Sequence, residues 1–127
     1  MRVLSSRVLI SGHDFARSRA FYEETLGLDI AREYGAGGTV TGVVYFLGGG
    51  LLELTASGPS PTGVRLWIQV PDVAAEERRL AALGVTVRQP ATRMPWGLIE
   101  CWVEDPDGVE LRLVEVPPDH PLRRRVD

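Results

Sequence analysis

The sequence lacks several features that would place it outside the cell or in a membrane. Cys101 is the single cysteine in 127 residues, so the chain has no internal disulfide and suits a reducing compartment. No stretch approaches the about 20 consecutive apolar residues that a membrane-spanning helix needs. The opening "MRVLSSRVLI" lacks the apolar core and cleavage site of a signal peptide. We therefore expect a cytoplasmic protein with no membrane partner.

A strong charge of one sign is also missing. The formal net charge is -3 and the isoelectric point is about 5.4. Binding to nucleic acid needs a basic surface, so the composition predicts no nucleic-acid partner. The one basic cluster, Arg123–Arg125, is short and terminal, and we interpret it as a solvated tail.

Aromatic residues are scarce at 7%, whereas the chain contains 14 glycines and 9 prolines. Glycine and proline favour turns, and many turns indicate many strands. The length suits one domain with one substantial core.

The chain contains the same pattern twice. "RVLISGHDFARSRAFYEETLGLDI" starts at residue 7, and "RLWIQVPDVAAEERRLAALGVTV" starts at residue 65. Each begins with a strand-like apolar run and reaches an aspartate suited to cap a helix, Asp14 or Asp72. Each helix-length stretch ends in Leu-Gly, and Gly27 and Gly84 suit the left-handed conformation that closes a helix. The two aspartates lie 58 residues apart, so the spacing indicates an internal repeat.

Three strands are expected after each helix. They are predicted at 28–34, 41–47 and 51–56, and then at 85–91, 98–104 and 109–116. "LGGG" and "EDPDG" supply the last hairpin turn of each half. The segment 28–41 has a second interpretation, because "EYGAGGT" also suits a long loop.

The repeat predicts an α+β fold in a single domain, 1–127. Its parts are two βαβββ modules, at about 3–57 and 63–116, and a tail at 117–127. With the helices outside, the free faces of the two sheets can form a cup-shaped half-barrel. Side chains alternate along a strand, which predicts that the cup is lined by Arg7, Leu9, Ser11, Leu51, Glu53, Thr55, Arg65, Trp67, Gln69, Glu110, Arg112 and Val114.

Several segments resemble the vicinal oxygen chelate superfamily, which includes glyoxalase I, extradiol dioxygenases, fosfomycin-resistance enzymes and bleomycin-resistance proteins. They are "HDFARSRAFYEETLGL" (13–28), "LLELTA" (51–56), "WIQVPDV" (67–73), "MPWG" (94–97) and "WVEDPDGVELRLVE" (102–115). The pairing of "FYxxxLGL" with "DPDGxxxxL" is specific, and the likeness covers nearly the whole chain. The resemblance also implies a homodimer, and it leaves open whether the modules pair within one chain or across the dimer.

The resemblance places the metal ligands of metal-using members at four inward strand positions. Carried over one by one, these positions are Arg7, Glu53, Arg65 and Arg112. Guanidinium groups stay protonated and have no lone pair to donate, and a single carboxylate does not make a metal site. Both histidines fall elsewhere, His13 in a loop and His120 in the tail. We therefore predict no metal and no cofactor.

The candidate site is charged and partly aromatic. An excess of arginines in a concave site suits a carboxylate, phosphate or phenolate. The same charges also suit an ion network that only holds the sheets, with Arg7 on Glu53 and Arg112 on Glu110 or Glu53. Tryptophans can stack a flat ligand. The predicted ligand-binding residues are Arg7, Glu53, Arg65, Trp67, Trp96, Trp102, Glu110 and Arg112.

The leading hypothesis is a metal-independent binding protein of this superfamily that sequesters an anionic, partly aromatic small molecule, as antibiotic-resistance binders do. The alternative is a glyoxalase-like or other lyase or isomerase, with Glu53 or Glu110 as general base and metal-dependent only if the ligands lie elsewhere. Neighbouring arginines lower the pKa of a carboxyl group and weaken it as a base. The sequence leaves open the ligand, whether a reaction is catalysed, and the pocket size set by 35–41 and 91–97.

Overall fold

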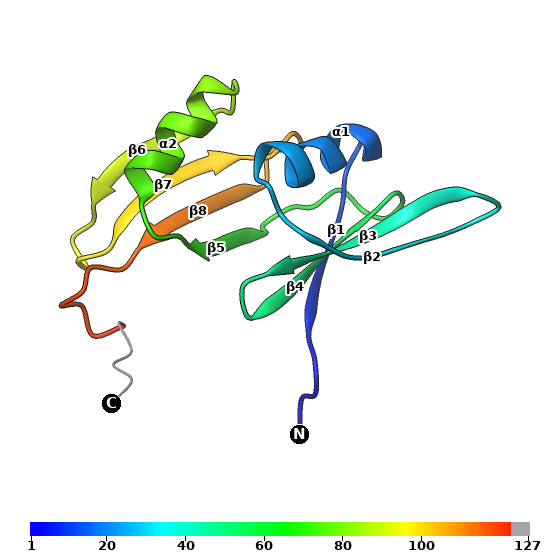
Figure 1. Cartoon of the computed structure of the whole chain (residues 1–127), viewed down its shortest axis with the longest axis horizontal. Coiled ribbons are helices and arrows are strands. Elements are labelled where there is room, and N and C mark those ends of the chain that lie inside the picture. The colour runs from blue at the N-terminus through cyan, green and yellow to red at the C-terminus, as the bar shows by residue number, and fades with distance from the viewer. Residues whose placement is uncertain (123–127) are drawn as a thin grey trace. The chain divides into compact units, whose positions relative to one another are not determined.

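A computed structural model describes residues 1–122 and divides the chain into two compact units, Met1–Gly63 and Val64–Asp127. Each unit has one four-stranded open sheet and a helical segment (Figure 1). The predicted α+β fold with two βαβββ modules is confirmed. The basic cluster Arg123–Arg125 lies outside the described residues.

Unit 1 follows the order strand, helix and three strands. Its elements are β1 (Arg7–Ser11), α1 (Phe15–Ala20), the π-helical turn η1 (Phe21–Thr25), β2 (Ile30–Ala36), β3 (Thr39–Leu47) and β4 (Gly50–Thr55). The sheet order is β1-β4-β3-β2, in which β1 runs parallel to β4 and the other pairs are antiparallel. The edge strand β1 therefore lies next to the last strand of its own unit.

The first helical segment begins and ends where the sequence predicts. The Asp14 side chain accepts a hydrogen bond from the backbone N–H of Arg17 at 3.1 Å, which caps the helix. Gly27 has a φ of 77°, and the N–H of Leu28 donates to the carbonyl of Tyr22 at 3.0 Å. This last bond keeps Leu28 in the helix end, so β2 starts two residues later than predicted.

The core of unit 1 contains two stacked tyrosines. The ring centroids of Tyr22 and Tyr45 lie 6.0 Å apart, and Phe21 meets Tyr22 edge-on at 5.1 Å. Both tyrosines are completely buried. The tyrosine pair therefore packs the helical segment against β3.

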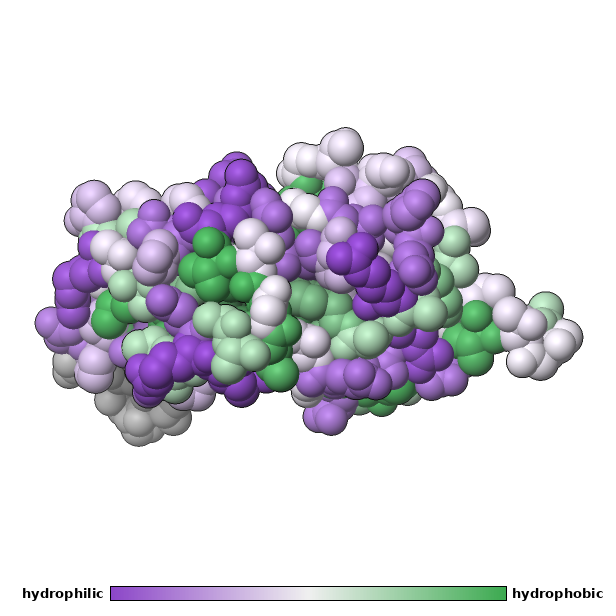
Figure 2. Space-filling view, turned by 90° about the horizontal axis from the view of Figure 1, so that it is seen from above, coloured by the Kyte–Doolittle hydropathy of each residue, from purple (hydrophilic) through white to green (hydrophobic). Residues whose placement is uncertain are grey.

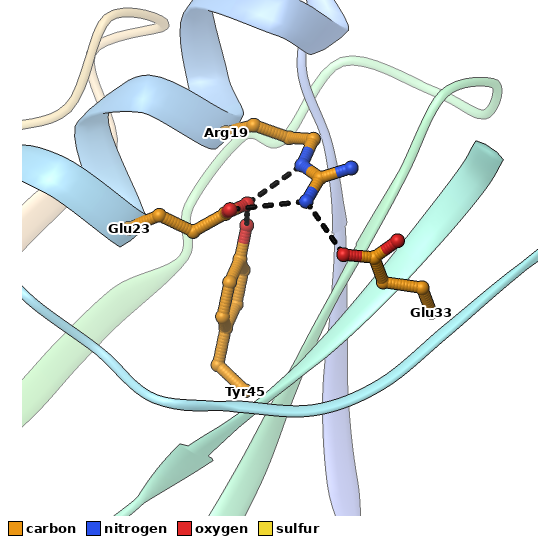
Figure 3. A network of polar contacts seen from close by, with 4 residues as sticks. All are labelled: Arg19, Glu23, Glu33 and Tyr45. Carbon is orange, nitrogen blue, oxygen red and sulfur yellow. Dashed lines mark hydrogen bonds and ion pairs between the residues drawn. The ribbon is translucent and has the colours of Figure 1, made fainter.

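A polar network closes the edge of this core (Figure 3). The Tyr45 hydroxyl donates to Glu23 at 2.7 Å, and the Arg19 guanidinium binds Glu23 at 2.6 Å and Glu33 at 3.0 Å. Burial and the bond to Glu23 raise the pKa of Tyr45, and the bond from Arg19 lowers the pKa of Glu23. The network thus joins the helical segment to β2 and β3 through a neutral Tyr45 phenol and the charged pair of Arg19 and Glu23.

The segment 28–41 forms a hairpin, so its interpretation as a long loop is wrong. Strands β2 and β3 pair antiparallel up to Ala36 and Thr39, and Figure 1 shows them as the long cyan hairpin. Gly37 and Gly38 have φ values of 60° and 78°, which suit a two-residue turn that only glycine adopts readily. The glycines in "EYGAGGT" therefore mark a tight turn.

Unit 2 repeats the same order. Its elements are β5 (Arg65–Gln69), α2 (Val73–Ala82), β6 (Val87–Arg93), β7 (Ile99–Glu104) and β8 (Glu110–Glu115). The sheet order is β5-β8-β7-β6, again with a parallel pair at the edge, and α2 packs against β6, β7 and β8. Asp72 caps α2 through the N–H of Ala75 at 3.0 Å, and Gly84 closes it with a φ of 82°.

The turn before β8 is built by Asp105. One oxygen of this buried carboxylate accepts the backbone N–H groups of Asp107 and Val109, both at 2.8 Å. Gly108 has a φ of 82°. The Asp105 side chain of "EDPDG" therefore stabilises the turn that leads from β7 into β8.

The two units differ in their aromatic residues. All three tyrosines of the chain lie in unit 1, at positions 22, 34 and 45, and all three tryptophans lie in unit 2, at 67, 96 and 102. Seen from above, the surface carries hydrophilic residues interspersed with smaller hydrophobic areas (Figure 2). No helix among the described residues is long and apolar enough to cross a membrane.

Candidate functional site

The sheet of unit 1 carries an ion pair on the face that alternates with its buried leucines. Glu53 on β4 is 8% exposed and lies between Leu52 and Leu54, which are completely buried. Arg7 Nη1 on β1 lies 2.7 Å from Glu53 Oε1, and the Tyr34 hydroxyl on β2 donates to Glu53 Oε2 at 2.7 Å. Both carboxylate oxygens are therefore bound within the unit.

Tyr34 reaches Glu53 because the strand between them has a glycine. A Cβ atom at Gly42 on β3 would lie 2.0 Å from Tyr34 Cζ, so the tyrosine ring lies directly over this glycine. Tyr34 and Gly42 are register partners, and Gly42 is also the partner of Thr55 on β4. Tyr34 was not among the predicted site residues, and the isolated glycine in "TVTGVVYF" is the signal that marks such a close approach.

These contacts set the charge states of the cluster. The hydrogen bonds from Tyr34 and Arg7 lower the pKa of Glu53 below its ordinary value, and the Glu53 carboxylate raises the pKa of Tyr34. At neutral pH the cluster is therefore an arginine cation, a glutamate anion and a neutral phenol. Such a glutamate is a weak general base.

The corresponding face of unit 2 carries a row of aromatic and cationic residues across three strands. Trp67 on β5 is in register with Arg112 on β8, and Arg112 is in register with Trp102 on β7. The Arg112 guanidinium carbon lies 3.9 Å from the centre of the Trp102 ring, which is a cation–π contact. Arg112 Nε also donates to Glu110 at 2.9 Å. Its charge is thus held between an aromatic face and a carboxylate.

Arg65 differs from the other predicted arginines. Arg7 pairs with Glu53, and Arg112 pairs with Glu110, whereas Arg65 forms no ion pair with any residue in 1–122. It lies exposed on β5, two residues from Trp67, a residue that is 51% exposed. Three arginines stand against three carboxylates on these faces, Glu53, Glu110 and the buried Glu100, so the arginine count alone does not give an excess of positive charge. Arg65 is the arginine of the three that has no ion pair within residues 1–122.

Sequence reasoning missed a buried acid on the same face. Glu100 on β7 is 2% exposed, and its carboxylate accepts the indole N–H of Trp96 at 2.7 Å and that of Trp102 at 2.9 Å. The alternation in "IECWVE", where Cys101 and Val103 are completely buried, is the signal that places Glu100 beside Trp102.

Trp96 lies in a short turn between β6 and β7. The segment 91–97 is mostly ordered structure, since β6 extends to Arg93 and the N–H of Gly97 donates to the carbonyl of Met94 at 2.8 Å. His120 Nε2 lies 3.0 Å from the Trp96 carbonyl oxygen, while its Nδ1 accepts the N–H of Leu122. This histidine therefore fixes the turn, while Trp96 remains 52% exposed.

A surface hollow of about 370 Å³ lies elsewhere on unit 1, between the N-terminal segment and the β3–β4 turn. Its lining is Val3, Leu4, Ser5, Ser6, Phe46, Gly48, Gly49, Gly50 and Leu51. None of the eight predicted ligand-binding residues lines this hollow, so it is separate from the candidate site.

Each unit thus presents polar and aromatic groups on one sheet face and packs its helical segment against the sheet, so the chain is built from two βαβββ modules. The family model "Glyoxalase/Bleomycin resistance protein/Dioxygenase superfamily" matches residues 5–113. The chain belongs to this superfamily, and the resemblance seen in the sequence is confirmed. No curated protein matches the sequence significantly.

Solved structures of the same fold cover most of the chain. TnmS3, an antibiotic binding protein from Streptomyces sp. CB03234, is 23% identical with a TM-score of 0.77, over 91% of this chain and 98% of that one. A superfamily member from Sphaerobacter thermophilus DSM 20745 is 26% identical with a TM-score of 0.73, over 90% and 98%. A lactoylglutathione lyase from Agrobacterium tumefaciens is 19% identical with a TM-score of 0.68, over 86% and 90%.

The four positions to which the resemblance carries the metal ligands, Arg7, Glu53, Arg65 and Arg112, do not fit a divalent cation. Three of the four are arginines, and the fourth, Glu53, already binds Arg7 and Tyr34 with its two oxygens. Within residues 1–122 no three His, Cys, Asp or Glu side chains are grouped closely enough to hold a metal. We therefore derive no metal-assisted step from these residues.

Proposed function

We propose that this protein is a metal-independent small-molecule binding protein whose ligand is anionic and partly aromatic. One observation carries the proposal: Arg65, without an ion-pair partner among the described residues, lies beside the half-exposed Trp67 on one sheet face. A guanidinium gives a carboxylate or phenolate a forked pair of hydrogen bonds, and an indole face stacks a planar ring. TnmS3, which has the same fold and is described as an antibiotic binding protein, supports a binding role.

The proposal assigns different roles to the predicted residues. Arg65 and Trp67 are assigned to ligand contact, because both are exposed and share one face of β5. The exposed Trp96 is a separate aromatic contact at the β6–β7 turn, at the Glu100 end of the sheet. The stacked and paired residues Trp102, Glu110 and Arg112 shape the face of unit 2. Arg7 and Glu53 neutralise one another on the sheet of unit 1.

Binding is favoured over the lyase or isomerase alternative by the state of the two candidate bases. Glu53 has a lowered pKa, with Tyr34 and Arg7 on its oxygens. Glu110 is bound by Arg112 at 2.9 Å. A general base at neutral pH needs a carboxyl whose pKa is raised, so Glu53 does not suit proton abstraction, and the ion pair with Arg112 occupies the Glu110 carboxylate.

Metal independence is tested first. The protein is incubated with manganese, iron, nickel and zinc, dialysed exhaustively, and its metal content is measured by elemental mass spectrometry. We expect less than about one-tenth of an equivalent, because arginines repel divalent cations and have no lone pair to donate. Near-stoichiometric metal would contradict the proposal and place the ligands elsewhere in the chain.

Anion recognition is tested with a matched pair of probes, 3,5-dinitrobenzoate and 3,5-dinitrobenzamide, by titration calorimetry. We expect the acid to bind more tightly than the amide, and Arg65→Gln to weaken the acid about tenfold, since a hydrogen bond to a charged group is lost. Arg88→Gln is the control, because Arg88 pairs with Glu104 at 3.0 Å. Equal affinities for acid and amide, or an equal loss in both variants, would refute the role of Arg65.

A further inference from the structure

Glu100 is a buried acid whose surroundings are mostly apolar. It is 2% exposed and is the register partner of Val114, which is completely buried. Val114 forms a core cluster with Leu98 and Val116. A carboxylate at this place loses its hydration and must be compensated by protein groups.

The compensating groups are two neutral donors. Trp96 Nε1 donates to Oε2 and Trp102 Nε1 donates to Oε1, and no described Lys, Arg or His forms an ion pair with Glu100. An apolar residue of the same size would usually stabilise such a site at least as well as a buried charge. The arrangement is therefore better explained by what it does to the two tryptophans.

Trp96 is held firmly but remains open on one side. Its indole N–H is bound by Glu100, its carbonyl oxygen lies 3.0 Å from His120 Nε2, and the next residue, Gly97, has a φ of 91°. The side chain is nevertheless 52% exposed. An indole whose N–H edge is held by a hydrogen bond and whose ring is partly exposed loses little conformational entropy when a ligand ring stacks on it.

The same hydrogen bonds change the electronic character of the indoles. Donation of an N–H to a carboxylate increases the electron density of the ring, whose faces already carry the negative part of the quadrupole. A more negative face attracts a ring that is poor in electrons and repels one that is rich in them. The carboxylate thus adds a preference that a tryptophan bonded to water would lack.

We propose that Glu100 is a positioning residue that fixes Trp96 and Trp102 and directs the site toward planar, electron-poor aromatic anions. The inference rests on the proposed binding function and specifies its ligand class. Glu100 acts through the two indoles, without contact to the ligand.

The test compares two acids of similar shape, 3,5-dinitrobenzoate and 3,5-dimethylbenzoate, by titration calorimetry. We expect the wild-type protein to bind the dinitro acid about fivefold more tightly, which is the range of stacking preferences between aromatic groups. Glu100→Gln should bring this ratio close to one, because an amide accepts only one indole N–H and opposes the second with its own N–H₂. Glu104→Gln, on the same strand but paired with Arg88, should keep the wild-type ratio.

The outcomes separate the two proposals. If the wild-type protein binds both acids equally, the binding function stands and the preference inferred here is wrong. If it binds neither acid, both proposals are refuted. If Glu100→Gln keeps the wild-type ratio, Glu100 has no positioning role. Trp96→Phe serves where Glu100→Gln does not fold, since it keeps an aromatic ring, removes the N–H, and should also bring the ratio close to one.

Discussion

The chemistry of single residues in this protein is decided by their nearest partners. Glu53 and Glu100 are both buried glutamates on central strands, and each uses both oxygens. Glu53 meets a cation and a phenol, whereas Glu100 meets two indoles. The first arrangement neutralises a charge, and the second leaves a negative charge next to aromatic rings. Two identical side chains therefore serve stability in one unit and recognition in the other.

Glu53→Gln tests the first role through pH. The pKa of Glu53 lies below its ordinary value of 4.5, so its stabilising contribution is complete above that pH and is lost as pH falls through the lower folded value. We expect the variant to lose about 1–3 kcal/mol of unfolding free energy at pH 7, as for a buried hydrogen-bonded charge. Urea denaturation at pH 7 and pH 3.5 should show the difference between wild type and variant shrinking in acid. A difference that is independent of pH would contradict the ion pair.

Sequence reasoning at this scale was limited by register. Alternation along single strands suffices to put Glu53 and Arg7 on one face, because β1 and β4 pair without interruption. Alternation does not predict that Tyr34 joins this face, because the β2–β3 pairing shifts between Ile30 and Arg32 and again between Tyr34 and Gly35. Each shift changes which face a side chain reaches, and a sequence does not mark such irregularities.

The packing of strand on strand in the β2–β3 hairpin depends on one glycine. The Tyr34 ring occupies the space above Gly42, so an alanine there would displace the ring and break its bond to Glu53. We expect Gly42→Ala to destabilise the protein by about 1–3 kcal/mol, the usual cost of overpacking. Gly49→Ala is the control, because a Cβ at Gly49 meets no atom within 4 Å. Equal urea midpoints for both variants would show that Tyr34 moves freely.

Helices and strands were predicted better than side-chain contacts, because the residues that start and end a helix lie close to it in the sequence. The caps Asp14 and Asp72 and the closing glycines Gly27 and Gly84 act within a few residues of sequence. The π-helical turn was not foreseen. The N–H of Leu26 donates to the carbonyl of Phe21 at 2.8 Å, and the neighbouring Glu23 is held by Tyr45 and Arg19. Tyr45 lies 22 positions further along the chain than Glu23, so no local pattern indicates this contact.

The two units of the molecule repeat one strand order but carry different side chains on their sheet faces. Both sheets place a parallel strand pair at one edge, β1 with β4 and β5 with β8. The faces differ, since unit 1 has a neutralised ion cluster and unit 2 has a tryptophan and arginine row. One architecture thus carries two kinds of surface, and the proposed ligand contacts fall in unit 2.

The separation of tyrosines and tryptophans gives the two halves distinct optical reporters. Fluorescence excited at the red edge of the protein spectrum comes from tryptophan alone and so follows the second half, whereas the tyrosine band resolved by second-derivative absorbance follows the first. Because each half has its own buried core, we expect Gly42→Ala to move the tyrosine-detected urea midpoint and leave the tryptophan-detected one unchanged. Coincident shifts would show instead that the two halves unfold as one cooperative unit. Because the tyrosines and tryptophans lie in different halves, one sample is enough to measure both midpoints.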